Sequence, residues 1–496
     1  MTVEREVKLA ASPAFRMPAL ADVLEGVRAV RLPDRTLHTV YFDAADLRLL
    51  RWGASLRYRE EQGWTVKLPR PETGSALVRE EVSFPGDGGI VPNAALDLLR
   101  GMLRTADVEP VLQLRTDRRT IELRDGVDSV LAEVADDEVV VVSGLRRQAR
   151  FRELEVEQRE EGLPGLLEAV VARLRAAGAG EPDPTPKPVR ALGPRATAPA
   201  DVVVGPLPAE PTMAEVVRRA IAASVVHLVR HDPILRLDND PEGVHQARVA
   251  TRRLRSDLRT FAPLLEPGWL AEVRGQLRWL GDALAQARDT DVLLERLRRT
   301  ADRLDAADVA AAAQVIQGLE LRDKEAHASA LAVMTSDRYA GVLDLLVEAA
   351  NAPMFASDPA LPAADIVPRL VRRPWKALRR SVLAAGRDPA DEQLHGIRIR
   401  AKRARYAAEA AAPVVGKPAQ RFAKATARLQ DVLGEHQDAV VAAGWLRTWA
   451  ADQDSRDVAF VAGVLAGLEE AAADRTADRW RTSWEQVDRM SLRGWM

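Results

Sequence analysis

The chain has 496 residues, enough for several domains with sizeable cores, and it contains no cysteine, which excludes disulfides, thiolate nucleophiles and cysteine-ligated metals. No apolar run approaches the roughly 18 residues that a membrane helix requires, and the first residues lack the apolar segment of a signal peptide. A cytoplasmic protein without a membrane partner is therefore expected. The net charge of −2 hides a strong segregation of charge along the sequence, and the abundance of Ala and Arg indicates a bacterial source.

Residues 1–180 are expected to form a domain of short strands with a few helices. Strands are predicted at residues 3–10, 36–42, 54–60, 64–68, 77–84, 111–115, 120–123, 130–142 and 151–158. Short helices are predicted at residues 19–29, 94–103 and 165–176.

Charge recurs at every second residue of these strands, which places it on one face of each strand. The residues that share faces are Glu4, Glu6 and Lys8; Arg57 and Arg59; Thr65 and Lys67; Arg79 and Glu81; Gln113 and Arg115; Glu133 and Asp137; and Glu153, Glu155 and Glu157. An ordinary solvent-exposed face explains one such strand. Carboxylates sorted to the first and last strands, with cations on the middle ones, are better explained by a closed antiparallel barrel with a charged lumen. Such a lumen suits a hard divalent cation and phosphate oxygens, and hence phosphoryl transfer.

The ordered motifs Glu4-Arg5-Glu6-Val7-Lys8, Leu56–Arg59, Thr65–Lys67, Arg79–Glu81 and Glu153–Glu157 resemble the CYTH superfamily, also called triphosphate tunnel metalloenzymes. The resemblance implies an eight-stranded antiparallel β-barrel tunnel that binds triphosphate and Mg²⁺ or Mn²⁺. By this resemblance the catalytic residues are Glu4, Glu6 and Lys8, and the metal-side acids are Glu4, Glu6, Asp137, Glu153 and Glu155. The triphosphate-binding residues would be Lys8, Arg57, Arg59, Lys67, Arg79 and Arg115. Asp137 is preferred to Asp136 because it shares strand parity with Glu133, whereas parity does not decide whether Arg118 or Arg119 joins the cations.

Residues 181–211 form a proline-rich stretch, which we interpret as an extended, non-helical linker. Residues 212–496 show long amphipathic segments with a period near 3.6 and almost no strand signal, which predicts an all-α domain. Within it an internal repeat relates about residues 212–350 to about residues 360–496. The predicted fold is therefore α+β followed by all-α, with a pseudo-symmetric helical bundle as the second domain.

A histidine-led basic helix marks each half of this repeat. The two copies run from His245 to Arg255 and from His395 to Arg405, and a second shared element starts at Leu284 and at Leu433. On a helical wheel, the cations of each copy lie on one face and the apolar residues on another. A solvated face would explain one such helix. Two helices with their cations in register point to a polyanion, because clustered like charges repel each other without an anion among them.

The two copies resemble the CHAD family, the "conserved histidine α-helical domain", over about residues 212–496. This family is understood to bind inorganic polyphosphate in a basic groove between two helical halves. By that resemblance the polyphosphate-binding residues would be His245, Arg248, Arg252, Arg253, Arg255, His395, Arg398, Lys402, Arg403 and Arg405. The seven histidines of the chain show no metal-ligand spacing.

The leading hypothesis is a metal-dependent hydrolase of inorganic triphosphate or short polyphosphate, tethered to longer polyphosphate or polyphosphate granules by the helical domain. A non-catalytic polyphosphate-binding or targeting protein is the alternative. Thiamine triphosphatase remains open, whereas adenylate cyclase is disfavoured because no His-Phe pair precedes Glu4. Nucleic-acid binding is also disfavoured, since aromatic residues make up only 4% of the chain and the basic helices offer no stacking platform.

Overall fold

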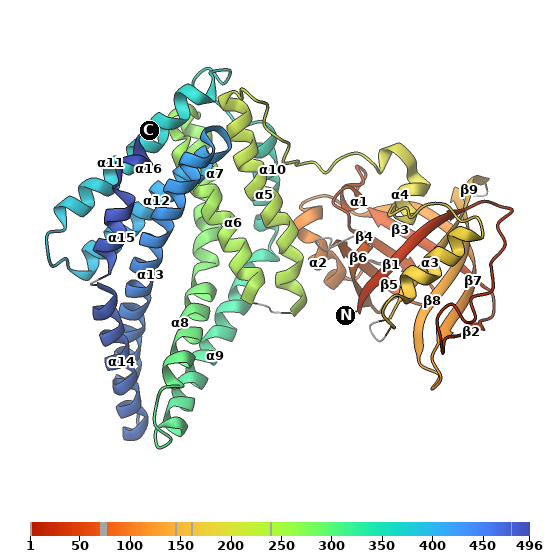
Figure 1. Cartoon of the computed structure of the whole chain (residues 1–496), viewed down its shortest axis with the longest axis horizontal. Helices are drawn as coiled ribbons and strands as arrows, with labels where there is room; N and C mark the ends of the chain where they lie inside the picture. Colours follow the sequence, from red (N-terminus) through yellow and green to blue (C-terminus); the bar gives the residue numbers. More distant parts are fainter. Residues whose placement is uncertain (1, 70–76, 144–145, 160–161, 239–240, 478) are drawn as a thin grey trace. The chain divides into compact units, whose positions relative to one another are not determined.

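The computed structural model describes residues 2–69, 77–143, 146–159, 162–238, 241–477 and 479–496. The chain forms two compact units, Met1–Asp201 and Val202–Met496, the first built on a β-sheet and the second all-helical (Figure 1). Among the described residues, no helix has the length and apolar character needed to span a lipid bilayer.

The first unit is a curled antiparallel sheet. Its strands are β1 (Thr2–Ala11), β2 (Arg28–Arg31), β3 (Arg35–Asp43), β4 (Ser55–Arg59), β5 (Gly63–Pro69), β6 (Leu77–Phe84), β7 (Glu109–Arg124), β8 (Val130–Ser143) and β9 (Arg146–Gln158). They pair in the order β2-β7-β3-β4-β5-β6-β1-β9-β8, and β8 also pairs with β7. The last pairing closes a ring of eight strands within the described residues, with β2 added beside β7. The predicted antiparallel barrel is confirmed.

The helices of this unit are α1 (Arg48–Arg51), α2 (Asn93–Leu103), α3 (Leu166–Ala176) and α4 (Lys187–Leu192), followed by the 3-10 turn η1 (Gly193–Arg195). The helix predicted at residues 19–29 is wrong, because this segment forms turns that lead into β2. Asp22 and Gly26 adopt left-handed φ angles of 57° and 79°, which a right-handed helix does not accommodate. The strands predicted at residues 111–115 and 120–123 are parts of one long strand, β7.

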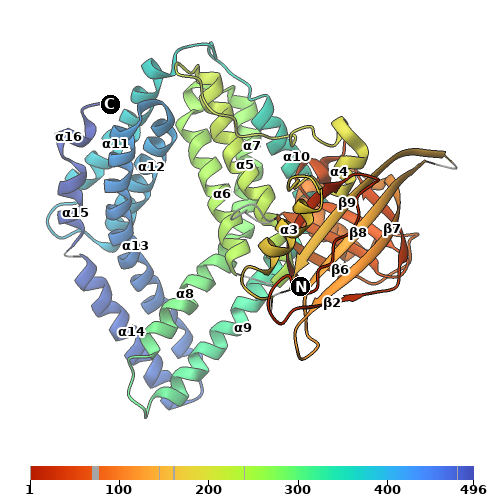
Figure 2. The ribbon, with the colours of Figure 1, turned by 45° about the vertical axis from the view of Figure 1, so that its right-hand side comes forward.

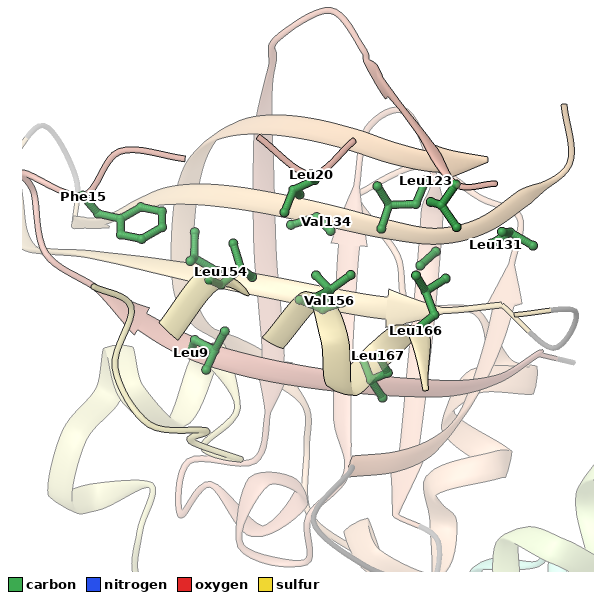
Figure 3. Close-up of a cluster of buried hydrophobic side chains, with 14 residues drawn as sticks. Leu9, Phe15, Leu20, Leu123, Leu131, Val134, Leu154, Val156, Leu166 and Leu167 are labelled. Atoms are coloured by element: carbon green, nitrogen blue, oxygen red, sulfur yellow. The ribbon is translucent and has the colours of Figure 1, made fainter. Parts of the chain in front are cut away.

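The outer face of the sheet carries apolar side chains that pack against α3, so the side chains of the other face point into the barrel. Leu9 of β1 and Leu154 and Val156 of β9 pack against Leu166 and Leu167 of α3 on the outer face (Figure 3). Each such side chain contributes about 1.5–3 kcal/mol when fully buried. Because successive side chains of a strand point to opposite faces, the charged residues between these apolar ones point inward.

The proline-rich stretch contains a helix, so its interpretation as a wholly extended linker is wrong. Pro188 lies in the first turn of α4, where the amide proton that proline lacks has no intrahelical partner. Ala191 and Leu192 pack against the apolar cluster of Tyr41, Leu112, Leu114, Val139 and Val141. This part of the stretch therefore belongs to the barrel, and α4 packs into one end of its interior.

The second unit consists of two similar sets of helices. The first set contains α5 (Met213–Asp238), α6 (Pro241–Thr260), η2 (Ala262–Leu264), α7 (Pro267–Ala283), α8 (Ala285–Ala301), α9 (Val309–Met334) and α10 (Asp337–Asn351). The second contains α11 (Ala363–Ala384), α12 (Asp391–Val415), α13 (Lys417–Ala451), α14 (Arg456–Ala477), α15 (Trp480–Val487) and α16 (Met490–Arg493). The predicted helical bundle is confirmed.

The duplicated segments occupy corresponding places in the two sets. The basic segments lie on α6 and α12, and the second shared element lies at the start of α8 and inside α13. The first set breaks at Leu284, between α7 and α8, where the second continues as one helix. Far from α6 and α12, the pairs α8–α9 and α13–α14 meet (Figure 2), around buried residues that include Leu297, Val315, Leu446 and Leu465.

Candidate functional site

The interior of the barrel holds a cavity of about 470 Å³ that carries charges of both signs. Its lining includes the cations Lys8, Arg57, Arg59, Lys67, Arg118, Arg159 and Lys187 and the acids Glu6, Glu81, Glu133, Glu155 and Glu157. These side chains come from strands around the ring and from α4. The cavity therefore has the mixed character that the sequence predicted for the lumen.

Strand register brings together three acids, of which Glu155 lines this cavity and the other two lie buried beside it. Asp137 of β8 is the cross-strand partner of Glu153 of β9, and Lys8 of β1 is the partner of Glu155. Carboxylate oxygens of Asp137, Glu153 and Glu155 lie within 4.8 Å of one another. Asp136 points to the other face, where it pairs with Arg152 at 2.7 Å. Asp137, and not Asp136, therefore lies in the acidic cluster.

The acidic cluster is neutralised by cations from three elements. The ammonium of Lys187, on α4, lies 2.5 Å from Asp137, 3.2 Å from Glu153 and 3.4 Å from Glu155. Arg118 of β7 contacts Asp137 at 2.7 Å and Glu155 at 2.6 Å, and Lys8 pairs with Glu155. Burial opposes the ionisation of Glu155, but these three cations hold its pKa well below the usual range.

The two other acids respond differently to the same surroundings. Burial would raise the pKa of Asp137, but Lys187 and Arg118 lower it. Burial does raise the pKa of Glu153, against the opposing charge of Lys187. Glu153 is fully buried, and neither of its carboxylate oxygens has a hydrogen-bond partner among the described residues.

The acidic cluster fits a divalent metal ion. Three carboxylates suit a hard cation such as Mg²⁺ or Mn²⁺. The carboxylate of Glu153 has no hydrogen bond among the described residues, although Lys187 and Arg190 lie 3.2 and 3.3 Å from its oxygens. Glu6, only 7% exposed and 3.5 Å from Lys8, lies beside the cluster and could add a fourth carboxylate.

Cations cover the opposite wall of the cavity. Lys67 of β5 pairs with Glu81 at 2.6 Å, and Arg57 of β4 contacts the same carboxylate at 3.3 Å. Arg59 donates to Thr39 Oγ1 at 2.8 Å and to Gln62 Oε1 at 3.0 Å. Burial, reinforced by Arg57, lowers the pKa of Arg59 to about 10, and a bound anion would offset both effects.

Not every predicted tunnel residue reaches the cavity. Arg115 lies outside its lining and pairs with Asp117 at 3.1 Å, on the opposite face of β7 from Arg118. The side chains of Glu4 and Arg79 lie outside the described residues, although their backbones are partners in the β1–β6 register. Arg118, which strand parity left undecided, and Lys187, which the sequence did not suggest, both enter the cavity.

In the helical unit, α6 and α12 bring their cations together. We call the face around Lys402, which also carries Arg248, Arg252, Arg255 and Arg398, the basic face. Burial and the four neighbouring arginines together lower the pKa of Lys402 to about 7. The arginines contribute to this shift because like charges disfavour the protonated form, so a bound anion would stabilise the ammonium of Lys402.

The edge of the basic face is partly neutralised. Arg253 and Arg405 both pair with Glu409, and each lies 5.6 Å from the ring of Tyr406. Glu409 follows the second basic segment by one helical turn and supplies an acid that the segment itself lacks. Arg403 is exposed.

Equivalent contacts recur in the two copies. Arg248 pairs with Asp289 at 2.8 Å, and Arg398 lies 4.0 Å from Asp438. His395 Nδ1 lies 2.7 Å from Gln437 Oε1, so this histidine is oriented toward the second shared element. The predicted phosphate residue His245 is half-buried on α6.

Comparisons with known proteins agree with both units. The chain matches the family model described as CYTH domain at residues 2–185 and the one described as CHAD domain at residues 219–447. Two uncharacterised proteins of Mycobacterium tuberculosis, from strains H37Rv and CDC 1551, are each 31% identical over 500 residues, which cover 95% of this chain and 94% of the relative.

Two solved structures also align with parts of the chain. PptA from Streptomyces chartreusis aligns at 22% identity with a TM-score of 0.47, over 55% of this chain and 99% of that one. The CHAD domain from the plant Ricinus communis aligns at 26% identity with a TM-score of 0.48, over 58% of this chain and 96% of that one.

The closed strand ring with its charged interior defines the first unit as a fold of the triphosphate tunnel metalloenzyme type. The chain belongs to the family of proteins in which a CYTH domain is followed by a CHAD domain.

Proposed function

We propose that the tunnel hydrolyses inorganic triphosphate or short polyphosphate with Mg²⁺ or Mn²⁺, and that the basic face binds longer polyphosphate. The observation that carries the first proposal is a cavity whose lining contains Glu155 of the acidic cluster together with the cations Lys67, Arg57 and Arg59. CYTH domain proteins are metal-dependent phosphatases or cyclases. The cavity offers charge contacts on both sides and few apolar surfaces for an organic group.

In this mechanism Asp137, Glu153 and Glu155 would hold the divalent cation, with Glu4 and Glu6 as the further carboxylates. The chemistry that such a cation supplies when bound is charge neutralisation and a more acidic water. Lys67, Arg57 and Arg59 would hold phosphate oxygens, and their fixed positions would orient the substrate for in-line attack. Lys8 and Arg118 lie between the two walls and would contact the reacting phosphoryl group.

Phosphate release by the full-length protein, with and without Mg²⁺ or Mn²⁺, tests the proposal. The substrates are tripolyphosphate, long-chain polyphosphate, ATP and thiamine triphosphate. We expect metal-dependent release from tripolyphosphate and little from ATP. Preferential release from thiamine triphosphate would assign an organic substrate instead.

One observation favours the alternative of binding without turnover. Lys187, Lys8 and Arg118 already neutralise the acidic cluster, so a cation must compete with them for the carboxylates. Tight polyphosphate binding without release from any substrate would make the tunnel a receptor.

The proposed polyphosphate contact predicts a pH dependence that originates at Lys402. Its pKa is about 7 in the free protein, and an adjacent polyanion would raise it toward the ordinary value. Binding then takes up a proton, so affinity should be highest below pH 7 and fall by up to about tenfold per pH unit above it. Isothermal titration calorimetry with polyphosphate between pH 6.5 and 9, in buffers of different ionisation enthalpy, measures both quantities.

Lys402→Arg is the matched control for this prediction. Arginine keeps the positive charge at all these pH values, so the variant should bind polyphosphate with a weaker pH dependence and little proton uptake. Identical pH profiles for the two proteins would contradict the role of Lys402. Competition by single-stranded DNA that exceeds competition by polyphosphate would overturn the ligand class.

A further inference from the structure

A second cluster of metal-ligand side chains lies in the helical unit, outside the basic face. Asp291 of α8 and Asp323 and His327 of α9 offer one ligand atom each, all within 4.8 Å of one another. His327 Nε2 lies 2.8 Å from Asp291 Oδ1 and 3.9 Å from Asp323 Oδ1. Asp323 and His327 are four residues apart on one helix and therefore share a face.

The cluster contains buried ligand capacity without a hydrogen-bond partner. The side chain of Asp291 is only 7% exposed, and its Oδ2 atom has no such partner within the described part of the chain. Arg288 lies 3.9 Å from this oxygen. Asp323 Oδ1 is also buried without a hydrogen-bond partner among the described residues. Unsatisfied carboxylate oxygens are costly in a protein interior, which makes a bound cation favourable here.

The cluster is also accessible from a cavity. A cavity of about 530 Å³, lined in part by Asp291 and Asp323, gives a small ion access to the carboxylates.

We propose that Asp291, Asp323 and His327 form a binding site for a divalent first-row transition metal ion such as Zn²⁺. One imidazole with two carboxylates is a donor set that suits zinc better than magnesium. Ligand atoms lie about 2.0–2.2 Å from zinc, so a small inward movement of the Asp323 carboxylate would complete the site. Metal binding would displace the proton that His327 Nε2 shares with Asp291. The ion would link α8 to α9.

The test is metal stoichiometry of the full-length protein after dialysis against Zn²⁺ with excess Mg²⁺. The wild type should hold one zinc equivalent more than His327→Gln or Asp323→Asn. Any zinc held in the tunnel is present in the wild type and in the variants alike, so it cancels when their stoichiometries are subtracted. Glu325→Gln, which alters an exposed acid on the same helix, should retain the wild-type stoichiometry.

Anomalous diffraction at the zinc edge gives an independent readout. A peak about 2.1 Å from His327 Nε2 is expected in wild-type crystals and should be absent in His327→Gln. Zinc should also raise the melting temperature of the wild type more than that of Asp323→Asn. Equal zinc stoichiometry in the wild type and all variants, or no anomalous peak at His327, would overturn the proposal. The three residues would then exchange protons but bind no metal.

Discussion

Glu155→Gln is expected to reduce metal-dependent phosphate release from tripolyphosphate by roughly 10²-fold or more. Glu155 lies in the acidic cluster, where Lys187, Lys8 and Arg118 hold its pKa well below the usual range against the effect of burial. Glutamine keeps the size of the side chain but removes the charge that a divalent cation requires. Initial rates measured across a range of Mn²⁺ concentrations separate a loss of metal affinity from a loss of turnover.

Glu138→Gln is the matched control for this substitution. Glu138 is on the neighbouring strand β8, but it faces away from the cavity and pairs with Arg119 and Arg150. Its replacement should leave the rate near that of the wild type. Wild-type turnover by Glu155→Gln would remove the acidic cluster from the proposed mechanism. Equal loss in both variants would indicate a general effect on the barrel.

Lys187→Ala is expected to destabilise the metal-free protein by about 3–5 kcal/mol, because removing one partner leaves buried carboxylates uncompensated. The ammonium of Lys187 is the only one within 4 Å of all three carboxylates of the acidic cluster among the described residues. A divalent cation would take over this role, so Mn²⁺ should stabilise the variant more than the wild type. Calorimetric unfolding of chelator-treated protein, repeated with Mn²⁺, measures both effects.

The pH dependence of the same variant has a defined sign. In the wild type, the lowered pKa of Glu155 contributes stability above the ordinary glutamate pKa, and this stability is lost as the pH falls through the lowered value. Without Lys187 the pKa values of the cluster rise, so the deficit of the variant should shrink as the pH is lowered. Arg195→Ala, an exposed cation just after α4, is the control. A metal-free Lys187→Ala protein as stable as the control would contradict this account.

The period of charge along the strands was sufficient to predict the barrel and most of its lumen. The period of charge did not show which face of β7 points into the barrel. Gln113 and Arg115 do share a face, but Leu112 and Leu114 occupy the interior at that end, where Ala191 and Leu192 of α4 pack on them. The inward cation is therefore Arg118. This placement depends on a contact between distant segments, which strand parity alone does not contain.

Lys187 was missed for a related reason. Its neighbours Pro186 and Pro188 suggested an extended chain, whereas proline is tolerated in the first turn of a helix. In the helical unit, the duplication identified α6 and α12 correctly. The Asp291, Asp323 and His327 cluster was not found because its ligands come from two helices, and histidine spacing alone gave no signal.

The packing of α4 into one end of the barrel has a consequence for how a long substrate would be used. A polymer that cannot thread through the barrel can present only a terminus to the acidic cluster, so cleavage would proceed inward from chain ends and spare internal bonds. Substrate and product would also share one entrance. Departing phosphate would then compete with the next terminus for the same cations, and turnover would slow as orthophosphate accumulates.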